Sequence, residues 1–164
     1  YGPGLGGKTT NLEYIHRHTR PERRGKLIAL NNAAERTLFF DLLPVDIGRY
    51  RDYEVRVHLC TVPGQIAQEQ IRQMVLRHVD GVVFVVDCQW ERLRDNLRSM
   101  RDLEDNLRIL GEEPNKLPTV VQFNKRDIVG ANGITRMRDA LGARVADIAG
   151  RYPLYEHLST PAAV

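Results

Sequence analysis

The chain of 164 residues is poor in aromatic residues and cysteine, and it has neither a long apolar run nor a charge of one sign. Aromatic side chains make up 7% of it and do not alternate with arginine or lysine, which argues against a surface that stacks nucleic-acid bases. The longest uncharged apolar runs, such as Val82–Val86, are as long as a strand and too short to span a membrane. The residues after Tyr1 do not resemble a signal peptide. We therefore expect a cytoplasmic protein with no integral membrane segment and no nucleic-acid partner.

Charge and cysteine content narrow the function no further. The 24 lysine and arginine residues are interspersed with 21 acidic residues, so the net charge of +3 does not indicate a polyanionic partner. Cys60 and Cys88 lie in apolar, strand-like segments and lack C-x-x-C spacing. We expect both to be buried free thiols, with a disulfide or a metal site as the alternative.

The residues Gly2 to Thr9 read G-P-G-L-G-G-K-T and match the phosphate-binding pattern G-x-x-x-x-G-K-[ST]. Glycines let successive N–H groups point at a triphosphate, Lys8 can reach its β- and γ-phosphates, and the Thr9 hydroxyl can hold Mg²⁺. The N-terminus of the following helix favours the same anion. A flexible glycine-rich turn is the alternative. The predicted nucleotide contacts in this segment are Gly2, Gly4, Leu5, Gly6, Gly7, Lys8, Thr9 and Thr10.

The rest of the chain alternates strand-like and helical segments. Strands are predicted at Leu27–Leu30, Leu38–Ile47, Tyr53–Val62, Val82–Asp87, Thr119–Asn124 and Leu154–Leu158. Helices are predicted at Lys8–Thr19, Gln65–His78, Trp90–Leu110 and Ile134–Gly150. The short link 48–52 predicts an antiparallel hairpin, and the successive apolar residues of 82–86 predict a strand covered on both faces. Together they predict an α/β fold, a three-layer sandwich with a mostly parallel central sheet and one antiparallel hairpin.

The two ends of the chain do not fit that fold. A phosphate-binding loop normally follows a buried strand, but only Tyr1 precedes it here, and Val164 leaves no room for a closing helix. We expect residues 1–164 to be one domain truncated at both ends, without the first strand and the last helix.

The residues Asn124-Lys125-Arg126-Asp127 read N-K-x-D and follow a predicted strand, where open α/β sheets bind their ligands. The Asp127 carboxylate can accept hydrogen bonds from guanine N1–H and the 2-amino group, which adenine lacks. Asn124 can brace the phosphate loop, and the stem of Lys125 can cover the base. Alone, four polar residues after a strand usually form a helix-capping turn. After a phosphate loop in chain order, they predict GTP binding.

Two segments between these motifs, 35–41 and 61–65, carry the residue types of a γ-phosphate sensor. Such a sensor needs a hydroxyl that joins Mg²⁺ and a glycine amide that contacts the terminal phosphate. Thr37 and Gly64 are the candidates, and Gln65 can orient an attacking water.

With these four motifs in order, the chain resembles the Ras-like small GTPases. The run E-R-T-L-F-F-D-x-L-P-x-D-I-G followed by T-V-P-G-Q resembles the bacterial MglA family more narrowly, from Tyr1 to about Asp127. The resemblance implies a magnesium-dependent switch that hydrolyses GTP to GDP in bacterial cell polarity or gliding motility. It implies a roadblock-type, MglB-like activating protein as partner. It also implies that Arg36 is an intrinsic arginine finger; a surface arginine paired with Glu35 is the alternative.

The chain departs from the Ras-like pattern at Thr61, where an aspartate usually holds Mg²⁺ through water. The MglA family shares this departure, and Asp41 is our candidate for the carboxylate that supports the metal. The last guanine loop is placed at Ser159 and Thr160, with the Ser159 amide facing guanine O6. Two rival functions stay open. One is a pseudo-GTPase scaffold that binds GTP with little hydrolysis, and the other is an ATP-dependent P-loop kinase or ATPase.

Overall fold

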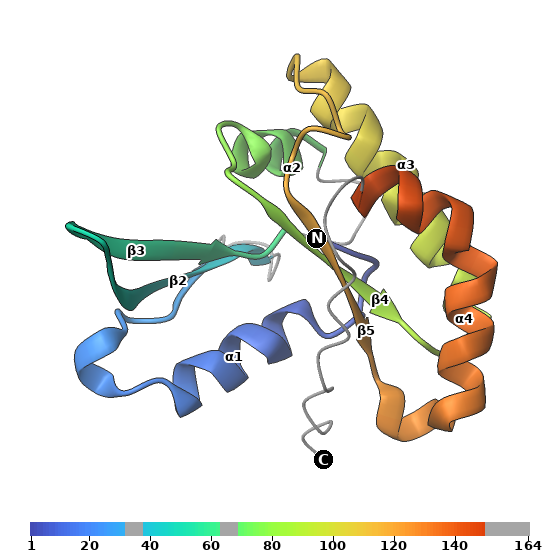
Figure 1. Cartoon of the computed structure of the whole chain (residues 1–164), viewed down its shortest axis with the longest axis horizontal. Coiled ribbons are helices and arrows are strands. Elements are labelled where there is room, and N and C mark those ends of the chain that lie inside the picture. The colour runs from blue at the N-terminus through green and yellow to red at the C-terminus, as the bar shows by residue number, and fades with distance from the viewer. Residues whose placement is uncertain (32–37, 63–68, 150–164) are drawn as a thin grey trace.

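The computed structural model describes residues 1–31, 38–62 and 69–149, which form both helices and strands (Figure 1). In chain order the elements are α1 (Lys8–His18), η1 (Pro21–Arg23), β1 (Ile28–Asn31), β2 (Leu38–Tyr50), β3 (Tyr53–Cys60), α2 (Glu69–Leu76), β4 (Val82–Asp87), η3 (Trp90–Arg92), α3 (Leu93–Ile109), β5 (Thr119–Asn124) and α4 (Arg126–Ala149). The predicted strand 154–158 lies outside these residues.

The predicted hairpin is confirmed, with a longer first strand than expected. β2 pairs antiparallel with β3, from Leu42↔Cys60 to Tyr50↔Tyr53, and β1 pairs antiparallel with the other edge of β2. The register shifts between Asp46 and Gly48, and Gly48 takes a φ of 99° there. A bulge of this kind absorbs one extra residue. β2 therefore continues past its predicted end at Ile47.

β4 and β5 form a parallel pair in the register Val82↔Thr119 to Asp87↔Asn124, which places Asp87 and Asn124 side by side at the carboxyl ends. Tyr1 lies along the edge of β4 that does not pair with β5, because its amino group donates to the Val83 carbonyl (2.8 Å) and its carbonyl accepts from the Val85 N–H (2.8 Å). The loop that begins at Gly2 therefore starts beside those carboxyl ends. In the described residues the strands form two sheets, β1-β2-β3 and β4-β5.

Helices cover both sheets. α1 packs on the hairpin through Leu12, which shares a small core with Leu43 and Val45. The larger core lies between β4, β5, α3 and α4, and α2 closes one side of it (Figure 1). None of the helices in the described residues is both long and apolar enough to span a membrane.

The predicted helix Lys8–Thr19 ends at His18, and within the described residues the predicted helix Gln65–His78 is helical at Glu69–Leu76. The other two predicted helices differ more. The segment predicted as Trp90–Leu110 is a 3-10 turn followed by α3, and the last predicted helix starts earlier than Ile134, at Arg126. Gly130, with a φ of 64°, interrupts α4 and divides its apolar pattern.

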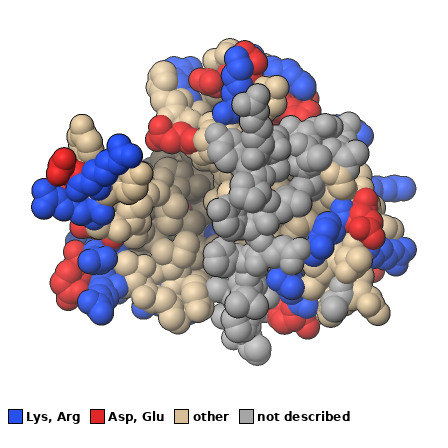
Figure 2. All heavy atoms as spheres, viewed as in Figure 1, with Lys and Arg blue, Asp and Glu red and all other residues tan. Residues whose placement is uncertain are grey.

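The prediction that both cysteines are buried free thiols is right for Cys88 and wrong for Cys60, which is free but exposed. The residues of β3 alternate between more and less exposed positions, and Cys60 lies on the more exposed side. On the face in Figure 2, acidic and basic side chains are interspersed, as their order in the sequence predicts.

Candidate functional site

The candidate site is the loop 2–7, which joins Tyr1 to α1 at the carboxyl ends of β4 and β5. Gly2 has a φ of 137°, and a Cβ there would lie 2.3 Å from the Val85 carbonyl oxygen. Gly7 has a φ of 94° and precedes α1, and its Cβ would lie 2.3 Å from Asn124 Nδ2. A side chain at Gly2 would clash with backbone, one at Gly7 would displace the Asn124 amide, and the positive φ disfavours a side chain at both positions. The two glycines let the loop leave β4 and close against Asn124.

Lys8 spans the loop from inside. Its ammonium donates to the carbonyls of Gly2 (2.8 Å) and Pro3 (2.7 Å). Burial lowers the pKa of Lys8 from 10.5 to about 8, because the charged form loses its hydration there. An anion bound beside the ammonium would restore a strong preference for the charged form. The position and the depressed pKa both fit a phosphate-binding lysine.

The guanine motif contacts the loop directly. The Asn124 side-chain amide donates to the Gly6 carbonyl (2.9 Å), which is the brace that the sequence predicts. Lys125, with a φ of 60°, donates to the buried carboxylate of Asp87 (2.7 Å) and lies 3.3 Å from Gln89 Oε1. Asp127 lies exposed in the first turn of α4, where its carboxylate can accept hydrogen bonds from a base.

Thr9, at the end of the loop, and Thr61 both contact the side chain of Asp41. The Thr9 hydroxyl donates to Asp41 Oδ2 (2.8 Å), and the Thr61 hydroxyl donates to the same oxygen (3.0 Å). Thr61 Oγ1 also accepts from the Asp41 N–H (3.0 Å), and the Thr61 N–H donates to the Asp41 carbonyl (2.9 Å). Asp41 and Thr61 are 4% and 6% exposed. The structure thus brings the predicted metal-supporting carboxylate to Thr9, and Thr61 orients that carboxylate.

These donors fit Mg²⁺ held together with a nucleotide. A hydroxyl and a carboxylate are hard oxygen ligands, and Mg²⁺ usually takes only one or two protein ligands besides phosphate and water. In the part of the chain that the structure describes, no three His, Cys, Asp or Glu side chains form a cluster that could hold a metal without such a partner.

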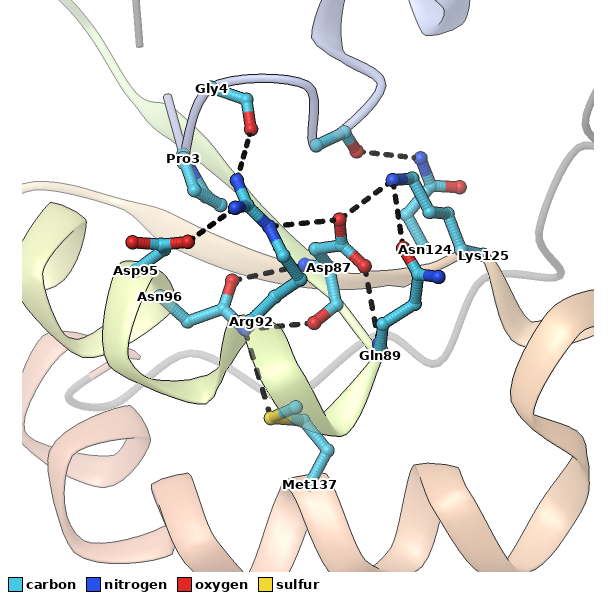
Figure 3. A network of polar contacts seen from close by, with 12 residues as sticks. Pro3, Gly4, Asp87, Gln89, Arg92, Asp95, Asn96, Asn124, Lys125 and Met137 are labelled. Carbon is cyan, nitrogen blue, oxygen red and sulfur yellow. Dashed lines mark hydrogen bonds and ion pairs between the residues drawn. The ribbon is translucent and has the colours of Figure 1, made fainter. Parts of the chain in front are cut away.

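Sequence reasoning missed two residues of the site, Asp87 and Arg92 (Figure 3). Arg92 donates to the Gly4 carbonyl (2.7 Å), and Asp87 accepts from Lys125. One signal was available: Asp87 ends a buried strand next to Asn124, so a chemistry-bearing residue was to be expected there.

The other predicted site residues divide into two groups. Leu5 is 88% exposed with a φ of 61°, and Thr10 lies exposed in the first turn of α1. Six predicted residues lie outside the described ranges, namely Arg36, Thr37, Gly64, Gln65, Ser159 and Thr160.

Comparisons with known proteins point to one family and one fold. The chain is 50% identical over 144 residues to the mutual gliding-motility protein MglA of Myxococcus xanthus (strain DK1622), a match that covers 88% of this chain and 74% of that protein. Its structure resembles that of the Arl6 (BBS3) small GTPase from Trypanosoma brucei, solved with the bound nucleotide analogue GppNp, with a TM-score of 0.61 and 20% identity over 97% of this chain and 82% of that chain. No protein-family model matches the chain. The structural likeness confirms the predicted small-GTPase fold, and the sequence identity is high enough over both chains to show the family.

Proposed function

Because the chain belongs to the MglA family of Ras-like small GTPases, we propose that it is a molecular switch that binds guanine nucleotides and hydrolyses GTP to GDP and phosphate. The observation that carries the proposal is the hydrogen bond from Asn124 to the Gly6 carbonyl, which joins the guanine motif to the phosphate loop. One nucleotide can then place its base at Asp127 and its phosphates in the loop 2–9.

The binding roles follow from the contacts of the loop. Lys8 and the loop amides take the phosphates, and Thr9 takes the metal with support from Asp41. When bound, Mg²⁺ neutralises charge on the β- and γ-phosphate oxygens. Ser159 and Thr160 are proposed to complete the pocket on the base side.

The hydrolysis roles rest on the family resemblance. Thr37 and Gly64 sense the γ-phosphate, Gln65 orients the attacking water, and Arg36 neutralises charge on the transferred phosphoryl group. An arginine finger of this kind is worth roughly 10³ to 10⁵ in rate. One observation favours the alternative function, a pseudo-GTPase scaffold, because Thr61 stands where most Ras-like proteins carry an aspartate.

Single-turnover hydrolysis of GTP separates the enzyme from the scaffold. We expect the parent protein to release phosphate faster than both Gln65→Ala and Arg36→Ala, while all three bind GDP alike. A parent no faster than either variant would contradict the hydrolytic function and favour the scaffold.

Base specificity is tested with Asp127→Ala. The matched control is Asp139→Ala, another exposed aspartate of α4. Inosine diphosphate lacks the 2-amino group of GDP, so we expect the parent and Asp139→Ala to prefer GDP and Asp127→Ala to lose that preference. An unchanged ratio of GDP affinity to inosine diphosphate affinity in Asp127→Ala would contradict the role of Asp127. If ATP competes for the nucleotide site of the parent as well as GTP does, the ATP-dependent kinase or ATPase is favoured.

We propose that the protein acts in bacterial gliding motility or cell polarity, in the cytoplasm, with a roadblock-type, MglB-like protein that stimulates its hydrolysis. The support is the likeness to MglA of Myxococcus xanthus. Addition of a purified roadblock-type protein should raise the hydrolysis rate of the parent and leave Gln65→Ala slow. A rate that does not change would contradict the partner and leave the nucleotide site standing.

A further inference from the structure

We propose that Arg92 and Asp87 are positioning residues for the nucleotide, an inference that rests on the proposed function. Arg92 fixes the orientation of the Gly4–Leu5 peptide in the phosphate loop. Asp87 lies between Arg92 and Lys125 and contacts both (Figure 3). We assign Arg92 to the phosphates and Lys125 to the base.

Arg92 holds the peptide bond between Gly4 and Leu5. Its guanidinium donates to the Gly4 carbonyl (2.7 Å) from the side of the loop on which η3 and α3 lie. In a planar trans peptide the carbonyl and the following N–H point in opposite directions. The Leu5 N–H therefore faces away from Arg92, as an amide that binds phosphate inside the loop must.

The peptide needs this external hold because of the backbone at Leu5. Its φ of 61° is in the left-handed region, which costs free energy for a residue with a side chain. The Leu5 side chain is 88% exposed and contributes little packing that would fix the conformation. A contact from outside the loop, such as the one that Arg92 makes with Gly4, therefore helps to hold this peptide in its orientation.

The guanidinium is itself held at three atoms. Besides the bond to Gly4, its NH1 lies 2.5 Å from Asp95 Oδ2, one turn further along, and its Nε lies 3.8 Å from Asp87 Oδ2. A planar guanidinium with partners in different directions has little freedom to rotate. A lysine ammonium at this position has no such fork and cannot serve the Gly4 carbonyl and Asp95 in the same geometry.

Asp87 joins the two halves of the site. Its side chain is fully buried, and its Oδ2 accepts from Lys125 (2.7 Å) while its Oδ1 accepts from the Gln89 N–H (3.2 Å). The Asn96 amide holds its backbone with two further hydrogen bonds of 3.0 and 2.8 Å. A buried carboxylate is stable only with such partners. The same carboxylate therefore sets the positions of Arg92 and Lys125.

The test compares Arg92→Met with Arg94→Met, which removes a nearby exposed arginine of α3. The readout is affinity for GDP and for GMP, because a diphosphate engages more of the loop amides than a monophosphate does. We expect Arg92→Met to lose about tenfold in GDP affinity, since a hydrogen bond from a charged donor is lost, and to lose much less for GMP. Arg92→Lys should not restore the preference for GDP.

The ratio of GDP affinity to GMP affinity separates an effect on the orientation of the loop from a general effect on the stability of the protein. Equal losses for GDP and GMP in Arg92→Met, or no loss for either, would overturn the inference. Asp87→Asn should weaken both nucleotides, because it releases Lys125 as well as Arg92. If Asp87→Asn does not fold, the Arg92 variants carry the test alone.

Hydrogen exchange of the loop amides in nucleotide-free protein gives an independent readout. We expect the amides of residues 4–8 to exchange faster in Arg92→Met than in Arg94→Met. If the parent binds no guanine nucleotide, the proposed function fails, whereas exchange still decides whether Arg92 orders the loop. Equal exchange in the two variants would overturn the inference.

Discussion

The depressed pKa of Lys8 makes nucleotide affinity depend on pH in a defined direction. In the nucleotide-free protein, burial lowers the pKa of Lys8 from 10.5 to about 8. A phosphate beside the ammonium raises that pKa again, so binding takes up a proton once the solution is above about pH 8. Affinity for GDP must therefore fall as the pH rises beyond this value.

The size of the effect follows from the pKa in the nucleotide-free state. At about pH 7 the ammonium is charged before and after binding, whereas at about pH 9 only roughly one molecule in ten carries the charge before binding. Apparent GDP affinity should thus be about tenfold weaker at pH 9 than at pH 7.

The stability of the nucleotide-free fold changes in the opposite direction. Its Lys8 pKa of about 8 is below the unfolded value of 10.5, so the unfolded chain binds more protons between these values. The cost of burying the charge is present in full below the lower pKa. It is relieved as the pH rises through this window, so the free energy of unfolding should increase there.

The assay is a fluorescence titration with a labelled GDP at several pH values, on the parent and on Lys8→Arg. Arginine stays protonated throughout, so the variant reports any titration of the nucleotide itself. We expect the affinity of the parent to fall with pH relative to that of Lys8→Arg. Parallel curves for the two proteins would refute the placement of a partly neutral Lys8 in the phosphate loop.

Three further predictions concern single positions. Gly7→Ala places a methyl group against the buried side-chain amide of Asn124, so GDP binding should be abolished in a titration. Normal binding would contradict the close approach of Asn124 to Gly7. Thr61→Val removes the hydroxyl that orients Asp41, so the magnesium concentration needed for half-maximal GDP binding should rise about tenfold; an unchanged requirement would refute that role. A thiol reagent should modify Cys60 in the native protein and Cys88 only after unfolding, because burial and a neighbouring carboxylate raise the pKa of Cys88 to about 12. Equal rates for the two thiols would contradict the fold.

Local patterns in the sequence predicted the buried strands and the loop well. The bounds of β4 and β5 match the predicted 82–87 and 119–124, because polar residues on both sides of a short apolar run fix where the strand begins and ends. The loop was recognisable because few sequences other than phosphate-binding loops need glycines, a lysine and a threonine at these spacings. The bulge in β2 and the break at Gly130 were not recognisable, since each depends on the conformation of one glycine.

Contacts between distant residues could not be predicted from such patterns. Arg92 and Gly4 are 88 positions apart in sequence, and only the folded chain brings η3, which carries Arg92, to the loop. In the sequence, Asp87 is only the polar end of an apolar strand. Its partners come from three other segments of the chain, so the strand pattern could not predict its contacts. The brace from Asn124 to the loop was predictable only because both motifs belong to one known arrangement.

Calorimetric titration of the parent protein with GDP and with ADP, in magnesium buffer, tests the central claim most directly. If one nucleotide bridges the loop 2–9 and Asp127, GDP should bind with a stoichiometry of one, and ADP should bind at least about a hundredfold more weakly, because it leaves the base-reading groups unpaired. Equal affinities for GDP and ADP would contradict the account.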